Sequence, residues 1–283
     1  MDDPAATLAE DTDHGAAWLS LFALEALQAA AETAATYNEV AMLARELRTA
    51  RPSMHAVANR VNRAMAAATE RTPAAVAESA RAVRERAADA DETAADNAAD
   101  RIDGATVLTL SRSGTVATAL DRAVTDGVVV LESLPGGEGV AVAESLSTDH
   151  DVTLARDAAV ADRVAAGVDA VLVGADAVLP DGGVVNKVGT RTAATVAAHE
   201  EVPVVVACAS AKVAPAGTTD AARELRSPAE LYDGDAPVAV HEPTFDRTPA
   251  ALVDVVVTER GTLDAAAVRA VAEEHAAAAE WPE

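Results

Sequence analysis

The fold is decided by the sequence AVLVG at residues 170–174, followed by TRTAATVAAHE at 190–200 and VPVVVAC at 202–208. The first and last of these are short, almost continuous apolar runs, as expected of strands that a parallel sheet buries on both faces. The segment between them mixes small apolar and polar residues over the length of a helix. A strand, a helix and a second strand in this order are typical of a parallel α/β unit.

The same alternation extends on both sides of this unit. Apolar runs recur at 107–111, 128–132, 152–155 and 252–258, and amphipathic stretches lie at 115–125, 138–148, 157–167 and 264–279. We therefore predict an α/β fold in which residues 104–283 form a Rossmann-like domain with a doubly wound, mainly parallel sheet.

The N-terminal part of the chain has a different composition, rich in Ala, Glu and Arg and almost free of β-branched runs. Apolar positions at helical spacing predict helices at 14–35, 38–48, 53–69 and 73–100. Pro52 and Pro73 lie near the starts of the last two, where proline is tolerated. We predict an N-terminal helical domain over residues 1–103, whose long, charged last helix connects it to the sheet.

The composition limits the classes of partner. The chain of 283 residues has a formal net charge of −24, and its only lysines are Lys187 and Lys212. Such a chain repels phosphodiester backbones, which argues against direct binding of nucleic acid.

Self-repulsion at this charge destabilises the compact state unless salt screens it. We hypothesise adaptation to a high-salt cytoplasm, the alternative being an ordinary acidic protein. The hypothesis predicts a thermal unfolding midpoint that rises between low and molar salt, and a midpoint that does not change would contradict it.

Other sequence features indicate a simple intracellular protein. Cys208 is the only cysteine, so no intrachain disulfide forms, and we interpret it as a buried packing residue. No uncharged apolar run reaches membrane-spanning length, and the acidic start MDDPAATLAED lacks the basic region of a signal peptide. The histidines show no ligand spacing. We expect a cytoplasmic protein with no membrane association, no metal site and no cofactor.

The residues that follow the first strand are candidates for anion binding, because ligands of open α/β sheets bind at the carboxyl ends of the strands. The sequence there is SRSGT, at residues 111–115. Ser113 and Gly114 are small enough to let helix N-terminal amides approach an anion, and Arg112 adds a positive charge. The alternative is that Ser113 or Thr115 only caps the helix.

Two further stretches follow strands. ESLPGGEG at 132–139 requires an unusual backbone path or is a flexible connection. The most informative stretch is GADAVLPDGGVVNKVGT at 174–190, which brings a carboxylate, an amide and a lysine to a strand end and a helix start. Asp176 is a candidate acid or base, and Lys187 with the amides near Gly189 is a candidate phosphate site. The alternative is an Asp–Lys pair that stabilises a turn.

This stretch resembles the signature of the family that joins the alpha, beta and delta subunits of translation initiation factor 2B to sugar-phosphate aldose–ketose isomerases. That signature contains Gly-Ala-Asp, a turn with glycine, and Asn-Lys-x-Gly-Thr. Other weaker matches follow in order, with RPS at 51–53, VLTLSRSGTV at 107–116, ES at 132–133, FD at 245–246 and TE at 258–259. The resemblance covers about residues 14–270.

The resemblance implies a helical domain and a Rossmann-like domain with a pocket for a phosphorylated sugar or a nucleotide between them. It also implies a homodimer or a higher oligomer. The expected ligand-binding residues are Arg51, Arg112, Ser113, Gly114, Glu132, Asn186, Lys187 and Gly189.

The sequence departs from the isomerase pattern at two positions. The isomerases use a cysteine after the first strand and the aspartate of Gly-Ala-Asp; Asp176 matches the aspartate, but Ser111 replaces the cysteine. Leu134 stands where the isomerases carry an arginine that would bind phosphate. A serine hydroxyl is far less acidic than a thiol and does not replace it unaided.

We therefore expect a factor-like protein that binds a phosphorylated ligand without efficient catalysis. The first alternative is an isomerase of ribose 1,5-bisphosphate or methylthioribose 1-phosphate with Asp176 and Ser111 as catalytic residues. The second is a structural oligomer subunit with a vestigial pocket.

Overall fold

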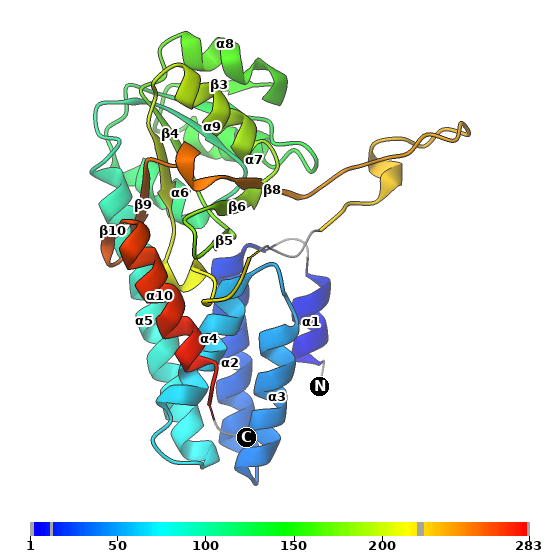
Figure 1. Cartoon of the computed structure of the whole chain (residues 1–283), viewed down its shortest axis with the longest axis vertical. Coiled ribbons are helices and arrows are strands. Elements are labelled where there is room, and N and C mark those ends of the chain that lie inside the picture. Colours follow the sequence, from blue (N-terminus) through cyan, green and yellow to red (C-terminus); the bar gives the residue numbers. More distant parts are fainter. Residues whose placement is uncertain (1–2, 12–13, 220–223, 282–283) are drawn as a thin grey trace.

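The computed structural model describes residues 3–11, 14–219 and 224–281 and confirms the predicted fold class (Figure 1). The helices are α1 Pro4–Glu10, α2 Ala16–Thr33, α3 Tyr37–Thr49, α4 His55–Ala67, α5 Pro73–Ala99, α6 Gly114–Arg122, α7 Gly139–Leu146, α8 Val160–Ala165, α9 Thr190–His199 and α10 Ala265–Ala278. The strands are β1 Thr106–Leu110, β2 Gly127–Leu131, β3 Val152–Ala155, β4 Ala170–Val173, β5 Ala177–Val178, β6 Val184–Lys187, β7 Val204–Ala207, β8 Phe245–Thr248, β9 Val255–Thr258 and β10 Gly261–Leu263.

The main sheet has the strand order β10-β9-β7-β4-β1-β2-β3, and all neighbours are parallel except β9 and β10. From β1 the chain builds outward through β2 and β3, then returns to β4 on the other side of β1. The order therefore reverses between β1 and β4, which is the switch point where open α/β sheets bind ligands. The expected strand at 252–258 begins later, because 250–252 form a 3-10 turn.

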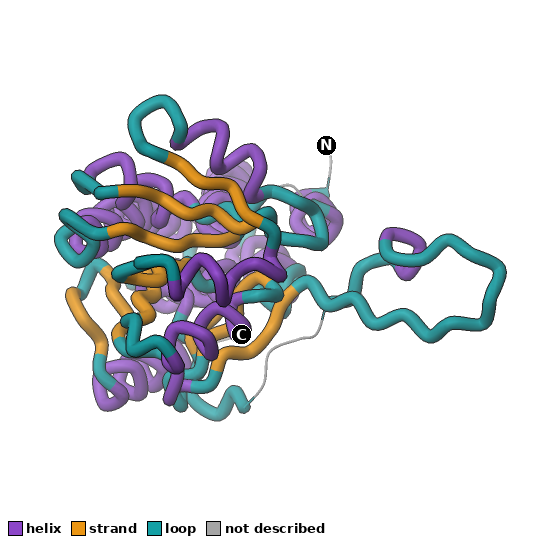
Figure 2. Tube along the Cα trace, turned by 90° about the horizontal axis from the view of Figure 1, so that it is seen from above, coloured by secondary structure: helices purple, strands orange, loops and turns teal. Residues whose placement is uncertain are grey.

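Both faces of this sheet are covered, which explains the continuous apolar strands. Leu108 and Leu110 pack on one face with residues of α8, α9 and α10, and Val107 packs on the other with residues of α5, α6 and α7. Neighbouring side chains of a strand point to opposite faces, so each strand must be apolar throughout. Seen from above, the layers of helix and strand are distinct (Figure 2).

The N-terminal helices form a second core, and α5 joins the two cores (Figure 1). Val76 and Val83, near the start of α5, pack among the N-terminal helices, whereas Ala95 and Ala98, near its end, pack under the sheet. The chain later returns to the bundle, because Trp281 is buried in the same N-terminal core. We propose that the N-terminal helical domain ends near residue 103 and is completed by this C-terminal segment.

A small antiparallel sheet, β5-β6-β8, was not predicted from the sequence. It corrects the expected position of Asn186 and Lys187, which lie on β6 rather than at the start of α9. Their register partners are Asp246 and Phe245 of β8. Two-residue and four-residue strands of mixed polarity carry too little periodicity to be recognised in a sequence.

Residues 225–243 form an arm that projects from the body of the molecule (Figures 1 and 2). A bridge between Leu225 and Pro243 closes its base, and the 3-10 turn η3, Pro228–Glu230, lies within it. Elsewhere in the described ranges, no helix has both the length and the apolar composition needed to cross a membrane.

Candidate functional site

A cavity of about 730 Å³ lies where the helical bundle meets the carboxyl ends of β1 and β4. Its wall combines the α3–α4 loop, the loop after β1, the residues after β4, the end of β6 and the base of the arm. The position coincides with the reversal of strand order in the main sheet. This cavity is the candidate site because both the topology and the sequence motifs lead to it.

The structure brings most of the residues singled out in the sequence into the wall of this cavity. Those that line it are Arg51, Ser111, Arg112, Ser113, Gly114, Asp176, Asn186 and Lys187. Glu132 and Gly189 are not among the lining residues. Leu134 is exposed and also lies outside the lining.

The N-terminus of α6 faces the cavity and is positioned by a close packing contact. Ser113 is the N-cap residue and accepts a hydrogen bond from the Val116 amide, so the capping alternative holds for its side chain. Gly114 and Thr115 nevertheless line the cavity. A Cβ at Gly174 would lie 2.7 Å from Ser113 Oγ, so this glycine lets β4 and the α6 N-terminus meet. Amides at a helix N-terminus favour an anion.

Ser111 is connected to Lys187 through a carboxylate that the sequence did not indicate. The Ser111 hydroxyl donates to Glu138 Oε1 at 2.9 Å, and Lys187 Nζ lies 3.0 Å from the same oxygen. Lys187 Nζ also donates to the carbonyl of Pro135, and its side chain is buried. Ser111 has φ of 64°, a left-handed conformation that is uncommon for serine and that is held by its amide donating to Ser133 Oγ.

Lys212 and Glu224 are further cavity residues that the motifs missed. Lys212 is buried at the end of the 3-10 turn η2, Ser210–Lys212, and its ammonium group makes no hydrogen bond or ion pair among the described residues. Glu224 lies within reach of Arg51 and accepts a hydrogen bond from the hydroxyl of Ser53. The scarcity of lysine was the one available signal for Lys212. The chain has only two lysines, and both line this cavity.

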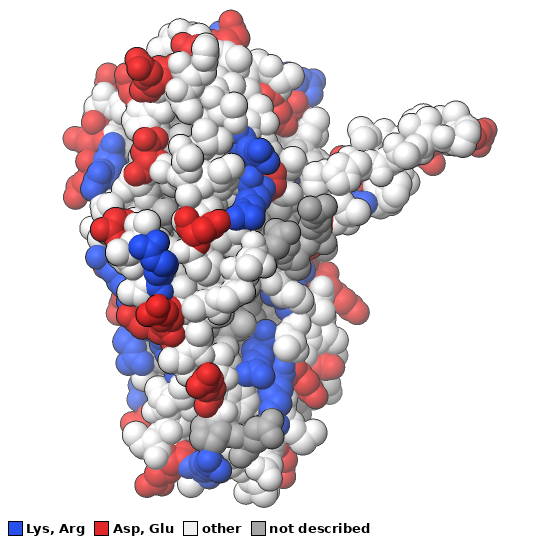
Figure 3. Space-filling model, viewed as in Figure 1, with Lys and Arg blue, Asp and Glu red and all other residues white. Residues whose placement is uncertain are grey.

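The charge of the cavity wall differs from that of the chain as a whole. Acidic and basic side chains are scattered over the visible surface (Figure 3), and the formal net charge is −24. The cavity wall instead carries an excess of basic residues. The basic residues are Arg51, Arg112, Lys187, Lys212 and Arg226, and the acidic ones are Glu138, Asp176 and Glu224. Such a local reversal of charge favours an anionic ligand.

The structure gives two expected ligand-binding residues other roles. The N–H of Gly189 donates to Asp246 Oδ2 at 2.8 Å, and the N–H of Arg191 donates to the same carboxylate. Asp246 therefore occupies the N-terminus of α9. The phosphate expected at the amides near Gly189 would have to displace this carboxylate. Glu132 forms an ion pair with Arg156, which directly follows the edge strand β3.

Asp176 follows β4 and faces the cavity. Burial raises its pKa, and the nearby Lys212 opposes that shift. An aspartate with a raised pKa holds a proton more readily than in water and is suited to acid–base chemistry. The motif that predicted this residue did not indicate the partner, because Lys212 lies far along the chain.

The raised pKa of Asp176 predicts a pH-dependent effect of Asp176→Asn. The folded protein binds this proton more tightly than the unfolded chain, so stability falls as pH rises above the ordinary pKa of an aspartate. The asparagine variant is expected to unfold at a higher temperature than wild type at pH 7. Below about pH 3 the two proteins should differ little. Calorimetric melts across pH measure this, and a variant less stable at pH 7 would contradict it.

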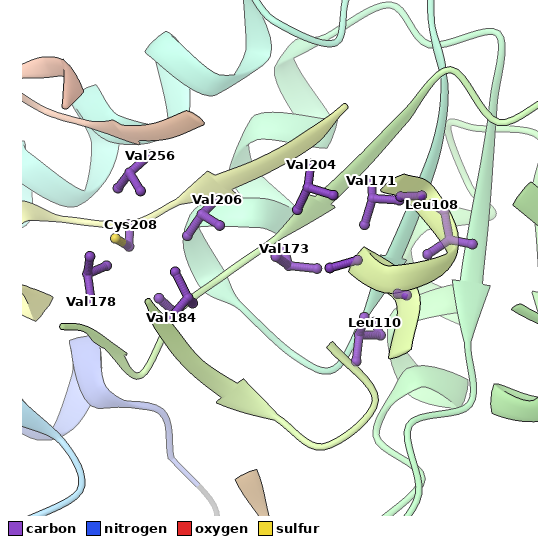
Figure 4. Close-up of a cluster of buried hydrophobic side chains, with 14 of the residues drawn as sticks. Leu108, Leu110, Val171, Val173, Val178, Val184, Val204, Val206, Cys208 and Val256 are labelled. Atoms are coloured by element: carbon purple, nitrogen blue, oxygen red, sulfur yellow. The ribbon is translucent and has the colours of Figure 1, made fainter. Parts of the chain in front are cut away.

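Cys208 is a packing residue, as expected, and does not line the cavity. Its side chain lies among Val178, Val206 and Val256 (Figure 4). Burial raises the pKa of its thiol to about 12, so it does not supply a thiolate at neutral pH. In the part of the chain that the structure describes, no group of three or more His, Cys, Asp or Glu side chains is arranged to hold a metal ion.

The geometry agrees with a family relationship that covers most of the sequence. A sequence profile described as the initiation factor 2 subunit family matches residues 12–265. The chain belongs to this family. The fold of the family is also seen in the crystal structure of translation initiation factor eIF-2B from Pyrococcus horikoshii OT3, with a TM-score of 0.81 and 25% identity over 92% of this chain and 95% of that chain.

Within the initiation factor 2 subunit family, the chain also resembles named isomerases. Ribose 1,5-bisphosphate isomerase of Haloferax volcanii is 33% identical over 171 residues, 56% of this chain and 53% of that protein. Methylthioribose-1-phosphate isomerase of Xylella fastidiosa is 35% identical over 132 residues, 42% of this chain and 37% of that protein. The chain thus matches about half the length of the first relative and less of the second. The family is related to sugar-phosphate isomerases.

Proposed function

We propose that this protein binds a phosphorylated sugar or a nucleotide in the cavity between the helical bundle and the sheet, without efficient catalysis. The observation that carries the proposal is the reversal of charge in the cavity wall. Both lysines of a strongly acidic chain are buried there, beside the N-terminus of α6. Burying a cation is unfavourable unless an anion compensates it. The ammonium group of Lys212 forms no hydrogen bond or ion pair with the described residues, and the nearby carboxyl of Asp176, whose pKa burial raises, is a weak counter-charge.

The lining residues suggest how the ligand binds. The amides of Gly114 and Thr115 at the start of α6 and the ammonium group of Lys212 would hold a phosphate. Lys187 would share its charge between the phosphate and Glu138. The amide of Asn186 and the carboxyl of Asp176 would contact sugar hydroxyls on the same side of the cavity.

The argument against efficient catalysis rests on Ser111. An aldose–ketose isomerisation moves a proton between neighbouring carbons and needs a group that can donate and accept it. The hydroxyl of Ser111 donates to Glu138, whose carboxylate is also paired with Lys187 and so is already engaged by a cation. Cys208 does not line the cavity, and burial raises the pKa of its thiol to about 12, so it does not act in place of Ser111.

The alternative function is an isomerase of ribose 1,5-bisphosphate or a similar sugar 1-phosphate. Two observations favour it as the second candidate. Asp176 has a raised pKa at the cavity, and the relatives that match part of the chain are named as isomerases. In this alternative Asp176 transfers the proton and Ser111 assists.

Phosphorus NMR with ribose 1,5-bisphosphate in molar salt distinguishes the two functions. We expect shifted or broadened phosphorus signals without the appearance of a ketose product. Conversion to the ketose would establish the isomerase and overturn the proposal. Unchanged signals would overturn phosphosugar binding and leave the vestigial pocket as the explanation.

We also propose that the arm, residues 225–243, binds a second copy of this chain. Its large apolar side chains Leu225, Leu231 and Val238 are each more than half exposed, an unfavourable arrangement for an isolated molecule. The base of the arm supplies Leu225 and Arg226 to the cavity wall, and Glu224 directly precedes it. Assembly through the arm would therefore fix residues of the site.

Truncation of the arm is expected to reduce the molecular mass in solution from that of an oligomer to that of one chain. Residues 228–240 would be replaced by a short glycine linker, and the mass measured by light scattering in molar salt. A second variant, Leu231→Ser with Val238→Ser, keeps the length of the arm and should weaken the same association. A mass equal to that of wild type in both variants would refute this role.

A further inference from the structure

A second cavity, of about 330 Å³, lies on the other side of the 3-10 turn η2 from the first. It is lined by residues of α4, α5, α10 and η2 together with Glu259, and Ser210 and Ala211 line it whereas Lys212 lines the first cavity. Three arginines, Arg60, Arg63 and Arg86, stand in its wall. None of the family motifs in the sequence falls on these arginines.

The side chains of two of these arginines have no hydrogen-bond partner among the described residues. Arg60 is partnered, since its guanidinium donates to Ser20 Oγ, the Ala87 carbonyl and Asp91 Oδ2. The guanidinium groups of Arg63 and Arg86 make no hydrogen bond or ion pair to any residue that the structure describes. Arg63 is half-buried. Burial and the charges of Arg260 and Arg86 lower the pKa of its guanidinium, and the charges of Glu274 and Glu259 oppose that shift.

The carboxylates nearby offset the charge of Arg63 only in part, because other groups engage their oxygens. Glu259 accepts from the amide and hydroxyl of Ser210 and lies 3.9 Å from Arg260. Glu274 is bound by both terminal nitrogens of Arg260. Asp89 lines the cavity but is exposed to solvent. A half-buried guanidinium with unused donors is stabilised most by an anion that accepts several hydrogen bonds.

A buried acceptor completes the wall. Asn59 is 2% exposed, and its Oδ1 has no hydrogen-bond partner within the described residues. Its Nδ2 is committed to the carbonyls of Ala211 and Val213, so the amide orientation is fixed with oxygen as the unused atom. The Nδ1 of His275 contacts the same Val213 carbonyl, which leaves Nε2 as its unused ring nitrogen. An unused acceptor of this kind suits a ligand hydroxyl.

We propose that this second cavity binds a small phosphate ester that carries hydroxyl groups. The phosphate is held by Arg63 and Arg86, and a hydroxyl of the ligand donates to Asn59 Oδ1. The volume is sufficient for a pentose phosphate, at the lower end of the usual range for small-molecule sites. The site is separate from the proposed phosphosugar cavity and does not depend on the function assigned to that cavity.

Isothermal titration calorimetry with ribose 5-phosphate, in molar salt, tests the proposal. In a Lys187→Ala background, which disables the first cavity, binding is expected to persist. Adding Arg63→Gln or Arg86→Gln to that background should weaken it by about tenfold or more. Arg86 is exposed, so its substitution leaves the core intact. Ribose without phosphate should not bind.

Arg81→Gln is the matched control, because Arg81 is an exposed arginine of the same helix α5 that pairs with Glu85 and lies outside the cavity. It should leave the affinity for ribose 5-phosphate unchanged. The proposal is overturned if Lys187→Ala alone abolishes binding, or if the Arg81 and Arg86 variants weaken it equally.

Discussion

Lys187→Ala is expected to weaken the binding of ribose 1,5-bisphosphate to the first cavity by about a hundredfold. The substitution removes a buried ammonium group at the cavity wall. It also leaves the carboxylate of Glu138 without its cation, and that carboxylate then repels the phosphate. The two effects act in the same direction, which makes this the largest functional effect predicted from the site. Calorimetric titration of the purified variant in molar salt measures it.

Arg247→Ala provides the control for Lys187→Ala. Arg247 lies on β8, the neighbour of β6 in the small sheet, and pairs with Asp181 away from the cavity lining. Its removal deletes a cation from the same sheet without touching the site, so affinity should change little. An affinity of Lys187→Ala within about twofold of wild type, with the fold intact by circular dichroism, would show that the cavity does not bind phosphate through Lys187.

Gly139→Ala is expected to cause the largest loss of stability, about 3 kcal/mol. A Cβ at Gly139 would lie 1.9 Å from the carbonyl oxygen of Leu131, a backbone atom that no change of side-chain rotamer can move away. The start of α7 would have to move away from the end of β2. At this chain length such a loss lowers the unfolding midpoint by roughly 6–12 °C. Thermal melts of the two proteins at one salt concentration measure the shift.

The matched control is Gly127→Ala, at the start of the same strand β2. A Cβ there would meet its nearest atom at an ordinary 3.7 Å, so little destabilisation is expected. The position of Gly139 also affects the site, because Glu138 precedes it and contacts both Ser111 and Lys187. If Gly139→Ala melts within about 1 °C of wild type, the close packing of α7 against β2 is not required.

The sequence predicted the parts of the fold that depend on local patterns. The valine-rich runs gave the central strands because a strand buried on both faces must be apolar at every position, as Val107 and Leu108 illustrate on opposite faces of β1. The same reasoning placed Ser113, Asp176 and Lys187 near one another, since residues that follow neighbouring parallel strands meet at one edge of the sheet. The small sheet of β5, β6 and β8 escaped prediction because its strands are too short to show a period.

By itself the sequence determined the α/β class, the family and the strand ends that form the cavity, because these follow from periodicity and from short contiguous motifs. Only the tertiary structure decided how the charges are partnered. It placed Asp246 at the start of α9, where Gly189 had been expected to bind phosphate, and it brought Lys212 to Asp176. It also placed the guanidinium groups of Arg63 and Arg86 in a second cavity without an ion-pair partner in the part of the chain that the structure describes. Electrostatic interactions depend on distance in space, and residues far apart in the chain are brought together only by the packing of the elements that carry them.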